Sequence, residues 1–106
     1  MGVQPSRARA LALSLGAVTE TPHFDRQAFR TPRKIFATLS EAAGDLNLMF
    51  DPDLRDFYCE SDPKAFSPVP GGWGRRGATR CRLDAVTEPS LLSALTAAHG
   101  LALPRR

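Results

Sequence analysis

The short connections in the first half of the chain constrain its fold more than any other feature. Three runs rich in aromatic and branched residues follow one another: HFDRQAFR (23–30), RKIFATL (33–39) and DLNLMF (45–50). Short turns join them, TP between the first two runs and SEAAGD between the last two. Because a parallel crossover needs a dozen or more residues, connections this short predict three antiparallel strands in a row.

Alternation within these runs predicts which side chains share a face of the sheet, since successive residues of a strand point to opposite sides. The second run divides into two sets, Ile35, Ala37 and Leu39 on one face and Lys34, Phe36 and Thr38 on the other. The third run alternates in the same way. Each strand therefore has one face that is suited to a core.

Three other segments have helical spacing instead. The first is predicted over residues 6–15, with Ser6 as its N-cap. The second begins at the cap Asp51, which is followed by a first-turn proline. The third begins near Thr87 and carries a stripe of leucines. These helices separate the strand-rich stretches without a regular β-α-β alternation.

Two more strands are expected between the second and third helices. AFSPV (65–69) is predicted as a short edge strand because it contains a proline, and ATRCRL (78–83) alternates with Thr79, Cys81 and Leu83 on one face. The order is then α-β-β-β-α-β-β-α. It predicts one α+β domain over residues 1–106, with a single antiparallel sheet of about five strands and three helices.

The connection between these two strands, PGGWGRRG (70–77), holds the only tryptophan of the chain. Its glycines match neither the P-loop, which ends in G-K-[ST], nor the dinucleotide-binding pattern G-x-G-x-x-G. A nucleotide cradle is therefore not expected. The glycines suit a sharp turn, and we expect the Trp73 ring to be mostly buried and to close this turn over the core.

Basic side chains gather in two parts of the chain, although the formal net charge is only +3. The first group is Arg26, Arg30, Arg33 and Lys34, and the second is Arg75, Arg76, Arg80 and Arg82. Acidic residues gather between them, over 51–62, which we interpret as the solvated face of a helix. Guanidinium groups clustered without an acid suit phosphate groups, whereas plain solvated surface is the alternative interpretation.

Nothing in the sequence has the spacing of a metal or catalytic motif. Cys59 and Cys81 fit neither a C-x-x-C pair nor a disulfide framework, so unpaired thiols are expected. His23 and His99 do not combine with them at metal-ligand spacing. Asp25 lies near His23, but no recognisable nucleophile accompanies this pair. We expect no metal, no cofactor and no enzymatic activity.

The N-terminal segment has two features that resemble targeting signals. MGVQPS fits a loose myristoylation pattern, and basic residues precede the apolar run ALALSLGAV. The apolar run is short and amphipathic, so a helix explains it better. No segment approaches the length of a membrane span. Together with unpaired thiols, these features predict a cytoplasmic protein without a membrane partner.

The stretches ALSLGAVTETPHF, AFRTPRKIFATL and DPKAFSPVPGGWGRRGATRCRLDAV occur in this order in the chain. Together they resemble the MmcQ/YjbR-like family of small bacterial proteins, over nearly the whole length. The resemblance implies the same α-β-β-β-α-β-β-α order as the residue patterns. Within its motifs, we assign structural roles to Trp73, Phe29 and Phe36. Many relatives have a second tryptophan directly after the W-G-x-x-G turn, where this chain has Ala78.

The resemblance also implies a double-wing DNA-binding arrangement, in which two hairpins and a concave sheet meet DNA, and it implies no enzyme activity. On this basis the two basic groups are candidate nucleic-acid-binding residues, with phosphates of double-stranded DNA as the expected partner. The alternative is a protein–protein interaction or chaperone-like adaptor domain that binds a protein partner. A continuous basic face would favour the first hypothesis, and an exposed apolar patch would favour the second.

Overall fold

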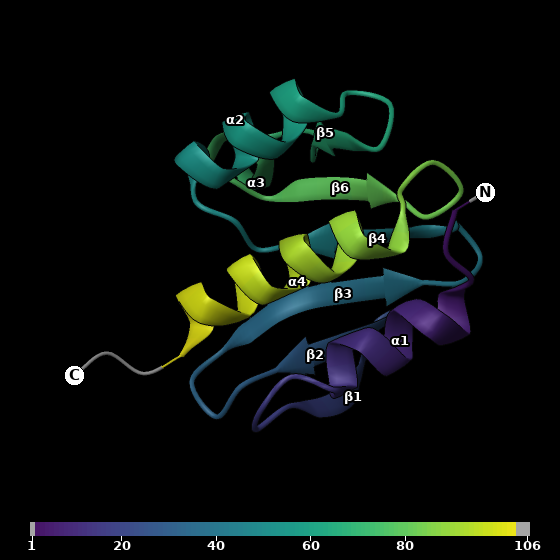
Figure 1. Cartoon of the computed structure of the whole chain (residues 1–106). Helices are drawn as coiled ribbons and strands as arrows, with labels where there is room; N and C mark the ends of the chain where they lie inside the picture. Colours follow the sequence, from purple (N-terminus) through teal and green to yellow (C-terminus); the bar gives the residue numbers. More distant parts are fainter. Residues whose placement is uncertain (1, 104–106) are drawn as a thin grey trace.

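One antiparallel sheet of six strands runs through the computed structural model, which describes residues 2–103 (Figure 1). The strands are β1 (Thr19–His23), β2 (Arg26–Arg30), β3 (Ile35–Ser40), β4 (Asp45–Leu48), β5 (Phe66–Pro68) and β6 (Thr79–Arg82). The helices are α1 (Pro5–Leu13), α2 (Pro52–Ser61), α3 (Gly72–Arg75) and α4 (Glu88–Ala102). The spatial order of the strands is β1-β2-β3-β4-β6-β5, so β6 lies between β4 and β5. The α+β class with one antiparallel sheet is confirmed, with one strand and one short helix more than expected.

The additional strand is β1, at the edge of the sheet. Its residues are mostly exposed and include Pro22, so it lacks the apolar alternation that marks a half-buried strand. An edge strand tolerates proline because its outer N–H groups need no partner in the sheet. The predicted strand over 23–30 is instead divided by a turn at Phe24 and Asp25, and the chain before this turn pairs with β2.

A bulge in β3 changes the predicted faces of that strand. Phe29 pairs with Ala37, but the next residue of β2, Arg30, pairs with Ile35, so Phe36 is an extra residue on β3. Such an insertion breaks the alternation locally. Phe36 consequently packs edge-on against His99 of α4, at 5.3 Å between ring centroids, on the side opposite Thr38. The prediction that Phe36 shares a face with Thr38 was wrong.

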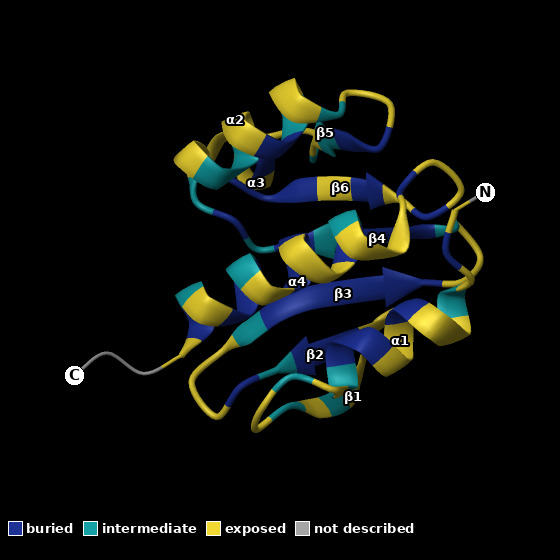
Figure 2. Cartoon of the chain, in the orientation of Figure 1, coloured by how far each residue is buried: buried dark blue, intermediate teal, exposed yellow. Residues whose placement is uncertain are grey.

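Cross-strand pairing gathers the apolar residues of the sheet on one face. One row joins Leu39, Leu46, Cys81 and Phe66 across four neighbouring strands. The same face of the sheet carries Phe29, and both Phe29 and Phe36 are fully buried. Figure 2 shows that β3, at the centre of the sheet, is buried along nearly its whole length.

Helices α1 and α4 pack against this apolar face and against each other (Figure 1). The cap at Thr87 is confirmed, because its side chain accepts a hydrogen bond from the Ser90 amide. The first helix begins one residue earlier than predicted, at Pro5, and the preceding Gln4 makes no side-chain cap. The proline suits the first helical turn, where its missing N–H is not needed.

An aromatic cluster joins α2 to the rest of the core. Asp51 caps this helix, as predicted, by accepting a hydrogen bond from the Leu54 amide. Tyr58 of α2 then stacks on Phe50 and contacts Phe66, with ring centroids 5.1 Å apart in both pairs. Its hydroxyl also bonds the Ser93 hydroxyl of α4 at 2.7 Å. These three contacts of Tyr58 hold α2 beside β5 and on the same side of the sheet as α4.

Both cysteines are unpaired, as predicted, and their burial differs. Burial raises the pKa of the Cys81 thiol from 9.0 to about 12, and the carboxylates of Asp62 and Asp45 add to this effect. Burial also raises the pKa of the half-buried Cys59 thiol. Because the thiolate is the nucleophile, both groups are poorly reactive in the folded protein, and Cys81 is also inaccessible.

We predict that a thiol reagent at pH 8 labels Cys59 slowly in the native protein and leaves Cys81 unmodified until the chain unfolds. Mass spectrometry after timed quenching measures this directly. In the matched variant Cys59→Ser, the native protein should stay unlabelled, while the denatured protein should take up one label. Rapid labelling of that native variant would contradict the burial of Cys81.

Candidate functional site

The second face of the sheet is not covered by α1 and α4, and we call it the open face. A row of directly paired residues crosses it from edge to edge: Thr21, Ala28, Thr38, Asn47, Arg80 and Ser67. Paired residues of neighbouring strands share a face, and this row alternates with the apolar row under the helices. The open face is therefore polar at its centre.

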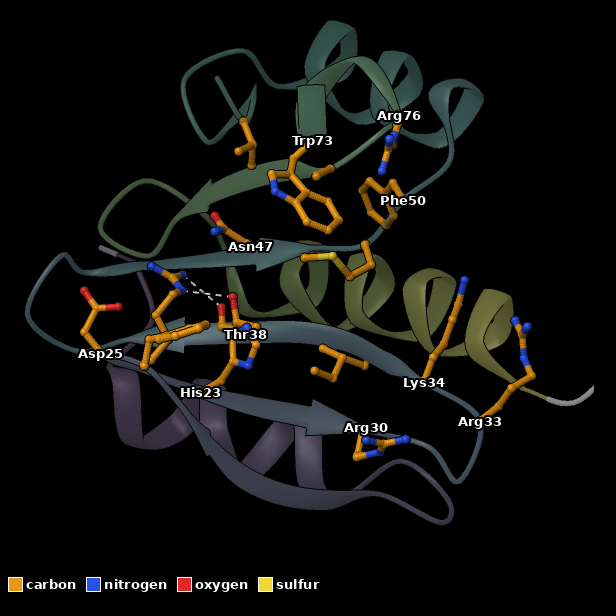
Figure 3. A pocket seen from close by; sticks show the side chains of 16 residues that line it. His23, Asp25, Arg30, Arg33, Lys34, Thr38, Asn47, Phe50, Trp73 and Arg76 are labelled. Atoms are coloured by element: carbon orange, nitrogen blue, oxygen red, sulfur yellow. Dashed lines mark hydrogen bonds between the residues drawn. The ribbon is translucent and has the colours of Figure 1, made fainter. Parts of the chain in front are cut away.

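A groove of about 880 Å³ lies on this open face (Figure 3). Its apolar lining comprises Phe24, Ile35, Met49, Phe50, Val69, Trp73 and Ala78. Its polar lining comprises His23, Asp25, Arg26, Arg30, Arg33, Lys34, Thr38, Asn47 and Arg76. Figure 3 shows Trp73, Phe50 and Arg76 along its upper side, and Arg30, Arg33 and Lys34 at its right-hand end. The groove thus combines apolar side chains with several cationic side chains.

The segment GGWGRRG forms the short helix α3, and its close packing decides where the tryptophan lies. A Cβ atom on Gly74 would lie 1.8 Å from the Val69 carbonyl oxygen, and one on Gly77 would lie 2.2 Å from that of Phe50. Gly77 also has a positive φ of 121°. Glycine thus allows the backbone of α3 to touch the ends of the neighbouring strands. Contacts between backbone atoms therefore close this turn.

Trp73 accordingly points outward and lines the groove, with 64% of its surface exposed. The prediction of a mostly buried Trp73 was wrong, because backbone contacts rather than the indole ring close this turn. The guanidinium group of Arg76 lies 5.9 Å from the centroid of the indole ring, within the range of a cation–π contact.

Arg55 of α2 is a positioning residue that the sequence did not reveal. Its guanidinium group donates to the carbonyl oxygens of Gly74 at 2.8 Å and of Arg75 at 3.3 Å, at the end of α3. It also bonds the Asp56 carboxylate at 2.9 Å. Arg55 thus ties α3 to α2. The only signal in the sequence was its position as the single base within the acidic segment 51–62.

Phe24 is a second exposed aromatic residue in the lining of the groove. It is 95% exposed at the tip of the β1–β2 hairpin, and its φ of 58° is uncommon for a large side chain. Its ring meets the His23 ring edge-on, with centroids 4.9 Å apart. The prediction of a strand over 23–30 did not include a turn here, so the exposure of Phe24 was not expected from the sequence.

The structure brings five of the eight predicted basic residues to the groove, namely Arg26, Arg30, Arg33, Lys34 and Arg76. The β2–β3 turn and the β5–β6 connection lie at the same end of the sheet, since Ala37 pairs with Leu48 and Leu48 with Thr79. Both connections therefore project in the same direction. Arg75, Arg80 and Arg82 do not line the groove.

Several of these arginines are already engaged within the protein. Arg26 donates to the Thr38 hydroxyl at 2.9 Å and to the Asp45 carboxylate at 2.8 Å. The second oxygen of Asp45 lies 3.5 Å from Arg80, and Arg82 pairs with Asp84 at 3.2 Å. The second basic group is therefore partly neutralised, by Asp45, which is distant in the sequence, and by Asp84, which directly follows this group.

Arg33 is engaged at the end of α4 instead. It donates to the carbonyl oxygens of Leu101 and Ala102, which lack partners within the helix. A cation at this position also suits the negative end of the helix dipole. Thr31 bonds the same Ala102 carbonyl oxygen at 2.7 Å, so the β2–β3 turn is fastened to α4.

Arg30, Lys34 and Arg76 form what we call the free cation set. Within residues 2–103, none of the three forms an ion pair with a carboxylate. Asp25 is the only acid among the groove-lining residues that the structure describes. The free cation set can therefore attract an anionic ligand into the groove.

Over the same described part of the chain, no group of three or more His, Cys, Asp and Glu side chains is arranged to hold a metal ion. No helix in that range combines the length and the apolar character needed to cross a membrane.

The family model described as YjbR matches residues 13–101 of the chain. The protein belongs to the YjbR family. This confirms the resemblance found in the motifs. The crystal structure of Deinococcus radiodurans protein DR2400, whose family-model domain is DUF419, is similar in fold, with a TM-score of 0.77 and 18% sequence identity. The similarity covers 95% of this chain and 78% of that one. Comparison with curated proteins gives no match.

We predict that Gly74→Ala destabilises this YjbR-family protein by about 1–3 kcal/mol, the usual cost of overpacking, because the new methyl group meets backbone atoms. Gly72→Ala is the matched control, since its Cβ would meet only the flexible Arg75 side chain at 3.6 Å. Urea unfolding should show a lower free energy of unfolding for Gly74→Ala than for the parent, and an unchanged value for Gly72→Ala. Equal stability of the two variants would contradict the close packing of α3.

We also predict that Asp45→Ala costs about 3–5 kcal/mol, because it leaves the guanidinium group of Arg26 half-buried without its carboxylate. The two side chains are only 18% and 11% exposed. In the control Asp84→Ala, the lost pair with Arg82 is exposed, and the expected cost is below about 1 kcal/mol. The free energy of unfolding is measured for both variants by urea unfolding. If Asp45→Ala lowers it no more than Asp84→Ala does, the pair between Asp45 and Arg26 contributes little to stability.

Proposed function

We propose that this protein is a cytoplasmic, non-enzymatic module that binds nucleic acid across the groove on its open face, mainly through phosphate groups. The observation that carries the proposal is the free cation set: Arg30, Lys34 and Arg76 line one groove without acidic partners. Phosphate oxygens accept charge-assisted hydrogen bonds from such groups. Family membership is compatible with the proposal and does not establish it.

The interactions of the basic residues within the protein reduce the number of cations that can contact phosphate groups. The sequence suggested eight basic residues on two hairpins, but Arg26, Arg80 and Arg82 are paired with carboxylates and Arg33 holds the end of α4. Contacts to phosphate should therefore come mostly from the free cation set, with Arg75 beside it on α3. Few phosphates are then engaged at once.

A small number of contacts fits weak binding. Non-specific affinities of this kind lie on the order of 10⁻⁴ to 10⁻⁶ M at physiological salt and fall as salt rises. The net charge of +3 also limits the attraction over long distances. Binding should thus be measurable mainly at low ionic strength.

A second candidate function is binding of a protein partner. The exposed aromatic side chains of Phe24 and Trp73 favour it, because large exposed apolar groups in a groove are typical of interaction sites. We rank it second because the cations in the lining outnumber the single carboxylate, Asp25. A protein partner would need an acidic segment to match this lining.

We predict that the triple variant Arg30→Gln, Lys34→Gln, Arg76→Gln binds an oligonucleotide more weakly than the parent protein. The slope of log affinity against log salt should fall in magnitude by roughly two to three, since each phosphate contact contributes about 0.7 to 0.9. Fluorescence anisotropy with a labelled DNA, titrated at several KCl concentrations, measures both quantities.

The matched control is Arg82→Gln together with Asp84→Asn, which removes an exposed ion pair outside the groove. It keeps the net charge of the chain and should leave both affinity and slope unchanged. Unfolding experiments should show that the triple variant is folded. Absence of binding by the parent at low salt, or equal binding by the parent and the triple variant, would overturn the proposed function.

A further inference from the structure

Trp73 is an exposed aromatic ring on a firmly held segment. It is the only tryptophan of the chain, and α3 holds it through the backbone contact of Gly74 and the hydrogen bonds of Arg55. Exposing a large ring to water is unfavourable unless a ligand covers it. The ring also stands over the groove rather than over bare surface (Figure 3).

The groove combines this ring with two other kinds of surface. Ile35, Met49, Phe50 and Val69 provide an apolar lining, while Arg76 places its guanidinium group over the indole, 5.9 Å from the ring centroid. Arg30 and Lys34 lie at the right-hand end of the groove, while Trp73 and Arg76 lie along its upper side (Figure 3). A ligand that fills the groove needs flat apolar parts for the apolar lining and anionic parts for these cations.

A nucleic-acid duplex does not offer this combination. Its outside presents phosphates and sugars, and its base faces are covered by stacking inside the helix. A single strand presents bases and phosphates together, and proteins bind it with aromatic side chains that stack on bases beside cations that contact the backbone. The apolar lining of the groove would stay empty against a duplex.

We infer that the groove binds single-stranded nucleic acid, with one base stacked on Trp73 and the neighbouring phosphates on Arg30, Lys34 and Arg76. This inference rests on the proposed function and specifies its ligand. Asn47, a half-buried residue of the groove lining, offers polar atoms to a base edge. Stacking tolerates every base, so little sequence preference is expected.

Ala78 is a small side chain in the groove lining and is buried. It follows Gly77, directly after α3, and its amide bonds the Trp73 carbonyl oxygen at 2.9 Å. A small side chain at this position takes up little of the groove, whereas a bulky one would fill part of it.

The test compares a fluorescein-labelled 15-nucleotide single strand of mixed, non-self-complementary sequence with the duplex of the same sequence. Anisotropy at 20 and 100 mM KCl gives the affinities for the parent, Trp73→Ala and Trp73→Phe. The intrinsic fluorescence of Trp73, the chain's single tryptophan, reports stacking on the unlabelled strands. Phe57→Ala is the matched control, because Phe57 is exposed to a similar extent, 61%, and lies outside the groove lining.

The parent should bind the single strand at least about tenfold more tightly than the duplex, and the single strand should quench Trp73 fluorescence. Trp73→Ala should weaken single-strand binding about 5- to 150-fold, the range for loss of one stacked base, and leave duplex binding within twofold. Trp73→Phe should retain part of the affinity. Phe57→Ala should behave as the parent.

Other outcomes separate this inference from the proposed function. If single strand and duplex bind equally, or Trp73→Ala has no larger effect than Phe57→Ala, the single-strand inference fails. The proposed function stands in that case, provided that the triple variant of Arg30, Lys34 and Arg76 still weakens binding. If neither form binds at 20 mM KCl, the proposed function fails, and the inference fails with it.

Discussion

One-sided burial of the sheet is the constraint on which the rest of this structure depends. The row formed by Leu39, Leu46, Cys81 and Phe66 supplies an apolar face, and α1, α4 and α2 cover it. Burial of this apolar surface is the main favourable contribution to folding. These helices lie on one side of the sheet, so the opposite face is left for solvent or a ligand, and the groove lies there.

Close backbone contacts at α3 fix the segment that carries Trp73 at the side of the groove. Gly74 in α3 and Gly77 just after it let the backbone touch Val69 and Phe50, which follow β5 and β4, and Arg55 bonds the carbonyl groups of Gly74 and Arg75. The indole ring of Trp73 on this tightly packed segment projects over the groove. The segment thus presents an aromatic surface to the groove.

Ion pairing selects which cations remain available to a ligand. Asp45 bonds Arg26 and lies near Arg80, although these residues come from three different strands. An arginine whose donors are occupied by a half-buried carboxylate is held in place and is costly to withdraw. Among the cations that line the groove, Arg30, Lys34 and Arg76 lack such a partner. Cross-strand register, rather than the number of basic residues, therefore sets the charge of the site.

The sequence by itself determined the α+β class, the antiparallel pairing, the caps Asp51 and Thr87, the unpaired cysteines and the family. These depend on local spacing, turn length and motif order, which can be identified directly in the sequence. Only the tertiary structure decided that β1 pairs at the edge, that a bulge turns Phe36 toward α4, and that Trp73 is exposed. It also decided which arginines are paired. Each of these outcomes depends on contacts between residues far apart in sequence, and local periodicity carries no information about such contacts.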